Sequence, residues 1–480
     1  MMNRENLTML TDFYEFTMAN GYLEHGFKDK IAYFDMFFRK VPDGGGFAIM
    51  VGVEQLIEYL KNLSFEDEDI EYLRSKGIFC EEFLEYLSNF KFECDVWAIE
   101  EGVPIFPGEP IVTVRGPIIQ AQFIETMILL TINHQSLIAT KANRIVRAAD
   151  GRAVMEFGSR RAQGYNAAIM GARAAYIAGC AGTACAIAER KYGVPALGTM
   201  AHSWIQLFDN EYDAFCSYAK TYPNDCTLLV DTYNVLKSGI PNAIKAFNDV
   251  LAPMGCRPKG IRIDSGDITY LSKKARKMLD DAGFEDCKIV ASNSLDEFII
   301  RDTLIQGAKI DSFGVGERLI TSSSEPVFGG VYKVVAVEEN DKIIPKIKLS
   351  ENVAKITTPC FKQVYRLFSK ENNKAIADVI TLHDEKIENS TSYEIFDPNH
   401  IWKRKKVEDF YAKPLLTKIF EHGKCVYNTP KLEDIKAFCK EQIDTLWDEV
   451  KRFENPHNYY VDLSQKLWDI KNDLLKQYSK

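Results

Sequence analysis

Short apolar runs alternate with polar or glycine clusters and helical patterns through the middle of the chain. This alternation is typical of parallel strands joined by right-handed helical crossovers. An eighth run is possible in the small-residue stretch 179–186, so the count favours a closed βα barrel over an open sheet. The seven clear runs are residues 153–157, 195–199, 227–231, 260–264, 288–292, 310–314 and 331–337.

The two ends of the chain have a different pattern. Residues 10–22 have helical spacing, residues 31–38 are aromatic and β-like, and a turn at Gly116-Pro117 closes this part. Beyond about residue 338 the pattern indicates more β structure, and amphipathic helices continue from residue 399 to the end.

These patterns predict an α/β fold in three parts. We expect an N-terminal α+β domain over residues 1–117 and an irregular βα barrel, the catalytic domain, over residues 118–338. We expect residues 339–480 to form a C-terminal β and helical extension that packs on the N-terminal domain.

Composition excludes several classes of protein. The 480 residues carry 59 Lys and Arg against 68 Asp and Glu, a net charge of −9, which is not the charge of a nucleic-acid binder. The longest uncharged stretches are rich in Gly, Ala, Thr, Pro and His, so neither a signal peptide nor a membrane span is expected. The eleven cysteines are odd in number and form no Cys-x-x-Cys, so neither a disulfide framework nor a zinc site is expected. We expect a cytoplasmic protein without nucleic-acid or membrane partners.

Polar residues gather where the predicted strands end. In a βα barrel the active site lies at the carboxyl ends of the strands, so residues from six strands are expected to converge there. These residues are 157–160, 198–202, Asp231, 262–267, 292–293 and 314–316.

The densest of these strand ends runs from Arg262 to Asp267. Asp264 and Asp267 are three residues apart and suit a hydrated Mg²⁺ or the hydroxyls of a sugar. The alternative for Asp267 is that it caps the helix predicted to start at Ile268.

Two further strand ends suggest phosphate chemistry. Gly314-Val315-Gly316, followed by hydroxyl residues 321–324, offers backbone N–H groups to a phosphate, although a hydroxyl-rich turn is the alternative. His202 could act as a general acid or base or accept a phosphoryl group, although a lone histidine is more often structural.

Arginines at the strand ends supply fixed positive charge. The guanidinium groups of Arg160, Arg161 and Arg262 suit a carboxylate or phosphate ligand, with ordinary surface ion pairing as the alternative for Arg161.

Taken in order along the chain, six sequence strings resemble the nicotinate phosphoribosyltransferase family over essentially its whole length. They are residues 10–15 (Leu-Thr-Asp-Phe-Tyr-Glu), 156–164 (Glu-Phe-Gly-Ser-Arg-Arg-Ala-Gln-Gly), 198–203 (Gly-Thr-Met-Ala-His-Ser), 260–267 (Gly-Ile-Arg-Ile-Asp-Ser-Gly-Asp), 314–316 (Gly-Val-Gly) and 329–333 (Gly-Gly-Val-Tyr-Lys).

The resemblance implies a reaction. Nicotinate and 5-phosphoribosyl 1-pyrophosphate would give nicotinate mononucleotide and pyrophosphate, coupled to ATP hydrolysis, in NAD salvage. It also implies a type II phosphoribosyltransferase fold, Mg²⁺ as cofactor, ATP as co-substrate, and a homodimer with active sites near the subunit interface.

The resemblance also suggests roles for single residues. His202 matches the histidine that ATP transiently phosphorylates, and Asp264 and Asp267 are the expected partners of Mg²⁺, directly or through water. Tyr14, Thr199 and Arg262 match nicotinate-contacting positions, and Phe157 and Arg160 complete the predicted nicotinate site; Gly314, Gly316 and Thr321, with Ser292 and Asn293, form the predicted phosphoribosyl pyrophosphate site.

One position bears on the choice between acid and amide. Relatives that use nicotinamide have an Asp after a Gly-Thr pair in this part of the barrel, whereas here Ala184 follows Gly182-Thr183, which favours the acid. Three alternatives stay open: a nicotinamide-using enzyme, a quinolinate-using enzyme and a non-catalytic pyridine-nucleotide sensor.

Overall fold

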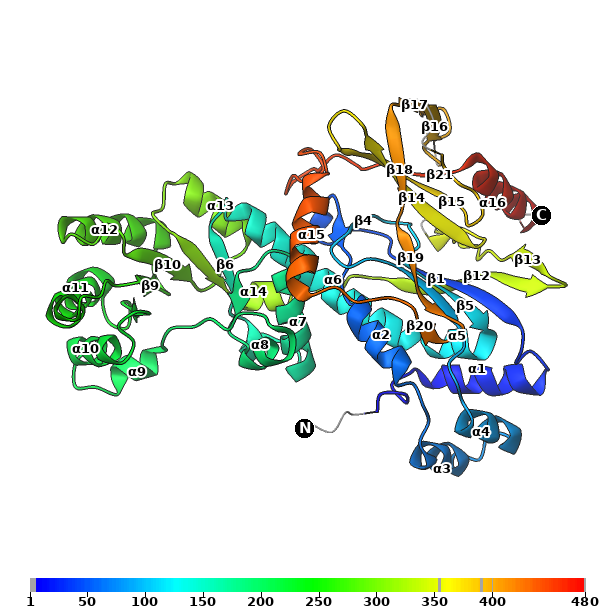
Figure 1. The fold of residues 1–480 in the computed structure, drawn as a ribbon, viewed down its shortest axis with the longest axis horizontal. Helices are drawn as coiled ribbons and strands as arrows, with labels where there is room; N and C mark the ends of the chain where they lie inside the picture. Colours follow the sequence, from blue (N-terminus) through cyan, green and yellow to red (C-terminus); the bar gives the residue numbers. More distant parts are fainter. Residues whose placement is uncertain (1–5, 353–354, 389–391, 399, 479–480) are drawn as a thin grey trace. The chain divides into compact units, whose positions relative to one another are not determined.

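The chain folds into two compact units (Figure 1). The computed structural model describes residues 6–352, 355–388, 392–398 and 400–478. The central unit is Ile138–Pro326, and the flanking unit combines Met1–Leu137 with Val327–Lys480. The central unit is shorter at both ends than the barrel domain expected at residues 118–338, because the first half of the long helix α6 (Glu125–Ala148) and strand β12 (Val331–Glu339) belong to the flanking unit.

The central unit is built on six parallel strands. In space their order is β7-β6-β11-β10-β9-β8, so the first strand of the unit pairs with the last, as the topology of a βα barrel requires. The strands are β6 (Ala153–Glu156), β7 (Gly182–Thr183), β8 (Thr227–Leu229), β9 (Gly260–Ile263), β10 (Lys288–Ser292) and β11 (Ser312–Val315).

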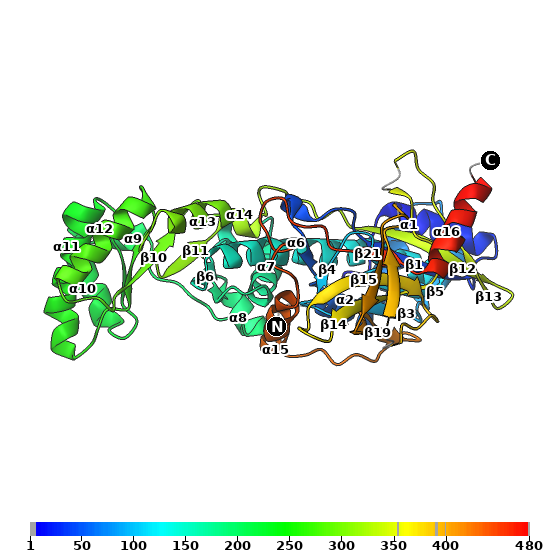
Figure 2. The same ribbon diagram turned by 90° about the horizontal axis from the view of Figure 1, so that it is seen from above.

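Helices follow these strands, as expected for crossover connections (Figure 2). In the connection between β8 and β9, α11 lies between two π-helical segments, Val235–Gly239 and Phe247–Leu251. The helices are α7 (Tyr165–Ile177), α8 (Ala186–Tyr192), α9 (His202–Gln206), α10 (Glu211–Thr221), α11 (Ile240–Ala246), α12 (Ile268–Asp281), α13 (Glu297–Ile305) and α14 (Glu317–Ile320).

Two of the predicted barrel strands differ from the structure. Residues 195–199 form no regular strand, and only Ala196 pairs, in a parallel bridge with Thr183 at the outer edge of β7. The prediction that residues 331–337 form a barrel strand is wrong, because β12 pairs antiparallel with β1 (Ile31–Phe37) in the flanking unit. Both segments are apolar, and an apolar pattern can predict a strand but not which strand it pairs with.

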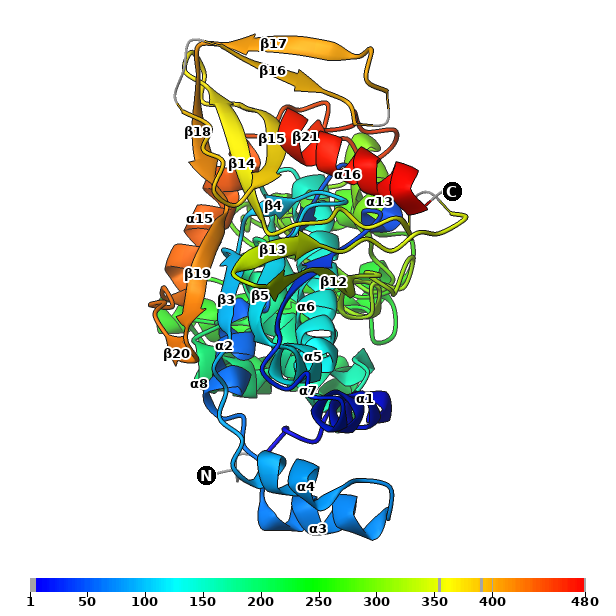
Figure 3. The same cartoon turned by 90° about the vertical axis from the view of Figure 1, so that its right-hand side faces the viewer.

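The flanking unit contains a seven-stranded sheet made from both ends of the chain (Figure 3). Strand β19 (Leu416–Glu421) pairs antiparallel with β3 (Asp95–Ile99), and this pairing joins the C-terminal extension to the N-terminal part. The order is β13 (Lys342–Pro345), β12, β1, β5 (Val112–Pro117), β3, β19 and β20 (Lys424–Cys425).

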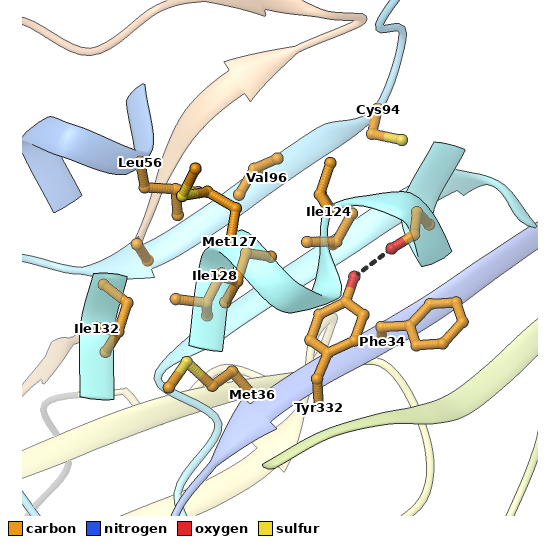
Figure 4. Close-up of a cluster of buried hydrophobic side chains, with 14 of the residues drawn as sticks. Phe34, Met36, Leu56, Cys94, Val96, Ile124, Met127, Ile128, Ile132 and Tyr332 are labelled. Atoms are coloured by element: carbon orange, nitrogen blue, oxygen red, sulfur yellow. Dashed lines mark hydrogen bonds between the residues drawn. The ribbon is translucent and has the colours of Figure 1, made fainter. Parts of the chain in front are cut away.

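Apolar side chains from this sheet and from the start of α6 form the core of the flanking unit (Figure 4). The rings of Phe34 and Tyr332 stack at 4.9 Å, and the Tyr332 hydroxyl donates to the carbonyl of Ala121 at 2.7 Å. Ile124 and Ile128 are fully buried beside them. Each such side chain contributes about 1.5–3 kcal/mol through burial. Helices α1 (Phe13–Glu24), α2 (Val53–Lys61), α3 (Asp67–Ser75), α4 (Glu81–Ser88) and α5 (Ile118–Phe123) complete the N-terminal part.

The C-terminal extension adds a four-stranded sheet and two helices. Arg366 and Asp378 lie opposite one another on its central strands and form a fully buried ion pair at 2.6 Å. No helix in the described ranges combines the length and apolar character that crossing a membrane requires. The remaining elements are β2 (Ala48–Ile49), β4 (Pro104–Ile105), β14 (Lys362–Ser369), β15 (Ala375–Leu382), β16 (Ser392–Phe396), β17 (Arg404–Glu408), β18 (Phe410–Pro414), β21 (Val461–Leu463), α15 (Leu432–Asp444) and α16 (Gln465–Tyr478).

Candidate active site

A pocket of about 240 Å³ lies at the carboxyl ends of β6, β9, β10 and β11. A second pocket of about 260 Å³ adjoins it and shares Arg160, Arg262 and Asp264 with it. Parallel strands bring their carboxyl ends to one edge, which is why residues distant in sequence meet here. The predicted residues that line one or both pockets are Phe157, Arg160, Thr199, His202, Arg262, Asp264, Ser292, Asn293, Gly314 and Gly316.

Arg262 is held in place by residues at the end of its own strand, at the end of β10 and in the segment before α9. Its Nη2 donates to Asp264 Oδ1 at 2.8 Å and its Nε donates to Ser292 Oγ at 2.9 Å. Its Nη1 lies 3.4 Å from both Thr199 Oγ1 and the Met200 carbonyl, so residues 199–200 lie beside β9 although they form no strand. A planar guanidinium with this many partners presents its charge in one fixed orientation.

Asp264 is an ionised carboxylate at neutral pH. Partial burial alone would raise its pKa, but hydrogen bonds from Ser292 and Arg262, together with the Arg262 charge, hold the pKa below its ordinary value. Both donors use Oδ1. The other oxygen, Oδ2, faces His202 Nε2 at 3.8 Å and can accept a further ligand.

His202 opens the short helix α9 and is about two-fifths exposed. Its Nδ1 lies 3.1 Å from Thr232 Oγ1, while its Nε2 faces Asp264. The ring is therefore oriented by contacts on both nitrogens and still reaches the solvent-accessible pocket.

Asp231 stabilises the loop that carries Asp264. Its Oδ2 accepts from the Asp264 backbone N–H at 3.0 Å and from Ser265 Oγ at 2.6 Å. The residue is 8% exposed, and its Oδ1 is buried without a hydrogen-bond partner among the described residues. Thr232, the next residue, contacts His202. Asp231 and Thr232 together therefore position both Asp264 and His202.

Glycines 314 and 316 allow the β11 end to approach the β6 end closely. A Cβ atom on Gly314 would lie 2.5 Å from the Phe157 ring, and one on Gly316 would lie 3.2 Å from the Phe157 carbonyl oxygen. Phe157 in turn packs at 5.9 Å from the Arg262 guanidinium. Larger residues at 314 would displace the aromatic wall of the pocket.

Asn293 and Ser294 bend the chain sharply after β10. Their φ angles are +80° and +54°, in the left-handed region that non-glycine residues seldom adopt. Strained backbone of this kind is most often found at ligand sites, and both residues line the first pocket.

Three predicted site residues lie elsewhere. Asp267 is exposed and caps α12 by accepting from the Tyr270 N–H at 2.8 Å, and Thr321 donates to the Glu317 carbonyl at 2.7 Å at the end of α14. Neither lines the two pockets. Tyr14 lies in the flanking unit on α1 and is 45% exposed.

The first pocket contains two further arginines: Arg161, for which the sequence also left surface ion pairing open, and Arg318, which the sequence did not single out. Arg161 and Arg318 line it, the first 3.5 Å from Glu317 and the second paired with Asp296. Arg318 follows Gly316 closely, so its place after a strand end was the signal that could have identified it. The first pocket thus has four arginines against two carboxylates, Asp264 and Glu317.

A resident divalent cation has one clear anchoring point here. No group of three or more His, Cys, Asp or Glu side chains within the described ranges is arranged to hold a metal ion. Mg²⁺ commonly needs only one or two carboxylates because waters and substrate phosphates complete its shell. Asp264 Oδ2 fits that limited requirement.

Comparison with known proteins identifies the family. Family models described as the nicotinate phosphoribosyltransferase (NAPRTase) N-terminal domain, the NAPRTase family and the C-terminal domain match residues 9–133, 152–365 and 361–471. A nicotinate phosphoribosyltransferase of Bacillus subtilis is 44% identical over 97% of this chain and 95% of its own length. The chain belongs to the nicotinate phosphoribosyltransferase family.

Solved structures agree with this membership of the nicotinate phosphoribosyltransferase family. Human nicotinic acid phosphoribosyltransferase has a TM-score of 0.84 at 27% identity, covering 97% of this chain and 100% of that chain. A nicotinate-nucleotide pyrophosphorylase from Pyrococcus furiosus, at 24% identity, 93% and 97% coverage and a TM-score of 0.70, shows likeness of fold alone. The predicted family and the predicted fold class are confirmed, and the chain is an enzyme of a phosphoribosyltransferase family.

Proposed function

We propose that this enzyme transfers the phosphoribosyl group of 5-phosphoribosyl 1-pyrophosphate to the ring nitrogen of nicotinate. The products are nicotinate mononucleotide and pyrophosphate. The observation that carries the proposal is the oriented Arg262–Asp264 pair in a pocket that has four arginines, a suitable environment for anionic substrates. The family relatives named as nicotinate phosphoribosyltransferases support the same reaction.

The residues present suit a dissociative displacement at the ribose. As pyrophosphate leaves, positive charge develops at the anomeric carbon, and the ionised Asp264 can stabilise that charge. Arg160, Arg161 and Arg318 can hold the anionic phosphate groups. Positioning and charge neutralisation, rather than a protein nucleophile, then supply the catalysis.

Nicotinate needs an aromatic surface and a cation. Phe157 supplies the first and Arg262 the second, with Thr199 oriented beside the guanidinium. Tyr14 is proposed as a further stacking residue on the strength of the family motif.

Mg²⁺ is proposed as the cofactor, held by Asp264 Oδ2 through direct or water-mediated contact. When bound, it would neutralise charge on the pyrophosphate leaving group. Asp267, which caps α12, lies three residues further along the same loop and is a candidate for an outer contact through water.

We further propose that His202 couples ATP hydrolysis to the condensation. The bond between the γ-phosphorus and ADP oxygen breaks as a phosphorus–nitrogen bond forms on the imidazole, and water later cleaves that bond to release phosphate. The ring is exposed enough for this step and is oriented by Thr232 and Asp264.

The acid is favoured over the amide as substrate. Ala184 is exposed at the end of β7, where an Asp would repel a carboxylate ligand. By the family resemblance, we also infer a homodimer that works in the cytoplasm in NAD salvage.

A product assay with three pyridines tests the proposal. The enzyme is incubated with phosphoribosyl pyrophosphate, Mg²⁺ and ATP, and with nicotinate, nicotinamide or quinolinate at equal concentration. We expect nicotinate mononucleotide to form fastest. Faster turnover of nicotinamide or quinolinate would favour those alternatives, and binding without pyrophosphate release would favour a sensor.

A further inference from the structure

Glu156 is a fully buried carboxylic acid at the last position of β6, directly before the pocket residue Phe157. Its Oε2 accepts from Thr183 Oγ1 at 2.6 Å, and its Oε1 accepts from the backbone N–H of Gly158. One side chain therefore joins the turn after β6 to the end of β7, the strand that pairs parallel with β6. The chemistry proposed above makes no use of this carboxyl group.

The environment of Glu156 does not favour a carboxylate for the sake of stability. Burial raises its pKa, and the hydrogen bonds from Thr183 and Gly158 oppose that rise. Both donors are neutral, and burying a carboxylate without an opposite charge costs free energy. What a carboxylate offers here is two acceptor oxygens, which hold two donors from different strands at once.

The turn after β6 has little room to move. Gly158 donates its N–H to Glu156, and a Cβ atom on Gly158 would lie only 2.6 Å from Ile320 Cβ on α14. The turn continues into a short 3-10 helix that carries Arg160, and Arg160 lines both pockets. A shift of Gly158 would therefore displace Phe157 and Arg160, its neighbours in the chain that line the site.

The end of β7 is held by the same residue. Thr183 Oγ1 donates to Glu156 and also accepts from the backbone N–H of Cys185 at 3.0 Å. Ala184, which lies between them, donates its N–H to the Glu156 carbonyl at 2.8 Å. Position 184 is thus fixed by both the backbone and the side chain of Glu156.

We propose that Glu156 is a positioning residue, which fixes the β6 turn relative to the end of β7 and thereby sets the affinity and selectivity of the site for nicotinate. The inference rests on the proposed function, in which Phe157 on the β6 turn and Ala184 at the end of β7 act on the pyridine. Glu156 lines neither pocket and acts through the segments that it joins.

Glu156→Gln tests the proposal, because it keeps the shape of the side chain and removes one acceptor. The amide oxygen still accepts from Gly158, but the amide nitrogen cannot accept from the Thr183 hydroxyl. We expect KM for nicotinate to rise about tenfold and the preference for nicotinate over nicotinamide to fall. We expect kcat to stay within about twofold, because Asp264 and His202 are held by other contacts.

The melting temperature distinguishes positioning from a purely structural role. Because Glu156→Gln also removes a buried charge, its melting temperature is expected to equal or exceed that of the wild type while KM rises. A lower melting temperature together with an unchanged KM overturns the proposal.

Thr183→Val removes the same hydrogen bond from its other end and should raise KM for nicotinate to a similar extent. In the double variant KM should rise no further than in the weaker-binding single variant, because one shared interaction is lost. Thr183→Ser keeps the hydroxyl and should recover most of the affinity. The matched control is Glu189→Gln at an exposed position of α8, which should keep the wild-type KM. A wild-type KM in either folded variant, or effects on KM that multiply in the double variant, overturns the proposal.

Hydrogen exchange followed by mass spectrometry separates this proposal from the proposed function. A wild type that forms no nicotinate mononucleotide would refute the function, but the exchange of backbone amides in residues 157–161 and 183–185 is measurable without turnover. These amides are expected to exchange faster in Glu156→Gln and Thr183→Val than in the wild type and Glu189→Gln. Equal exchange in all four proteins overturns the positioning role of Glu156.

Discussion

Arg262 and Asp264, two residues apart at the end of β9, form an ion pair with Nη2 2.8 Å from Oδ1. The same guanidinium bonds Ser292 on the next strand, so the cation and the carboxylate of the pocket have one fixed geometry. This geometry is what the proposed chemistry requires, because preorganised charges stabilise a transition state without reorganisation.

The geometry of the Arg262 guanidinium, which bonds two partners at once, should therefore matter more for activity than its charge. Arg262→Lys retains the charge and loses the simultaneous bonds to Asp264 and Ser292. We expect kcat/KM for nicotinate to fall by about 10²-fold. Steady-state kinetics measure this, with Arg257→Lys, an exposed ion-paired arginine of the central unit, expected to stay within about twofold. Equal effects at both positions would contradict the role of Arg262.

Thr232 is expected to affect energy coupling. Thr232→Val removes the contact with His202 Nδ1 and keeps the side-chain shape. Losing one such hydrogen bond costs about 1 kcal/mol, so stimulation by ATP should fall about five-fold while ATP-independent turnover changes little. Rates with and without ATP measure this, and Thr221→Val on the exposed end of α10 is the control. Undiminished stimulation would show that Thr232 does not orient the ring.

Ala184 is expected to control the choice of pyridine. Ala184→Asp places a negative charge at the end of β7, and kcat/KM for nicotinate should fall by about 10–100-fold relative to nicotinamide. Competition between the two substrates in one reaction measures the ratio. Ala186→Asp, an exposed alanine at the start of α8, should leave the ratio unchanged. If both variants keep the wild-type ratio, residue 184 does not set this preference.

Asp462 provides a prediction about stability and pH. Burial, and next the charge of Asp397, raise the pKa of Asp462 from 3.8 to about 7. The folded protein therefore holds a proton that the unfolded chain releases, and stability is lost as pH rises from about 4 to about 7. Asp462→Asn should raise the free energy of unfolding by about 2–4 kcal/mol at pH 8 and change it little at pH 4.

Chemical denaturation at the two pH values measures this difference. Asp473→Asn, an exposed Asp on α16, should show no dependence on pH. A free energy of unfolding at pH 8 that is lower for Asp462→Asn than for the wild type would contradict the energetic cost assigned to the buried, ionised Asp462.

Much of the candidate site could be predicted from the sequence. Arg262, Ser292, Gly314 and His202 stand at the ends of apolar runs, and parallel strands bring such ends together whatever their separation in the chain. The residue types at these positions then favoured phosphate and carboxylate ligands.

The remainder depends on tertiary contacts that no local pattern contains. Residues 195–199 lie beside β7 through one bridge, and β12 joins an antiparallel sheet, because pairing partners are chosen in space. Thr321 is turned into the end of its own helix by a bond to the Glu317 carbonyl. The contribution of Asp231 depends on its bonds to the neighbouring strand end, which spacing along the chain does not show.

The most direct test measures nicotinate mononucleotide and ADP in the same reaction, for the wild type and for His202→Ala, with each substrate omitted in turn. The account predicts that the wild type reaches full turnover, with both products formed, only when nicotinate, phosphoribosyl pyrophosphate and ATP are all present. It predicts that His202→Ala retains slow formation of the mononucleotide without ADP. No nicotinate mononucleotide from the wild type, or undiminished coupled ADP from His202→Ala, would contradict it.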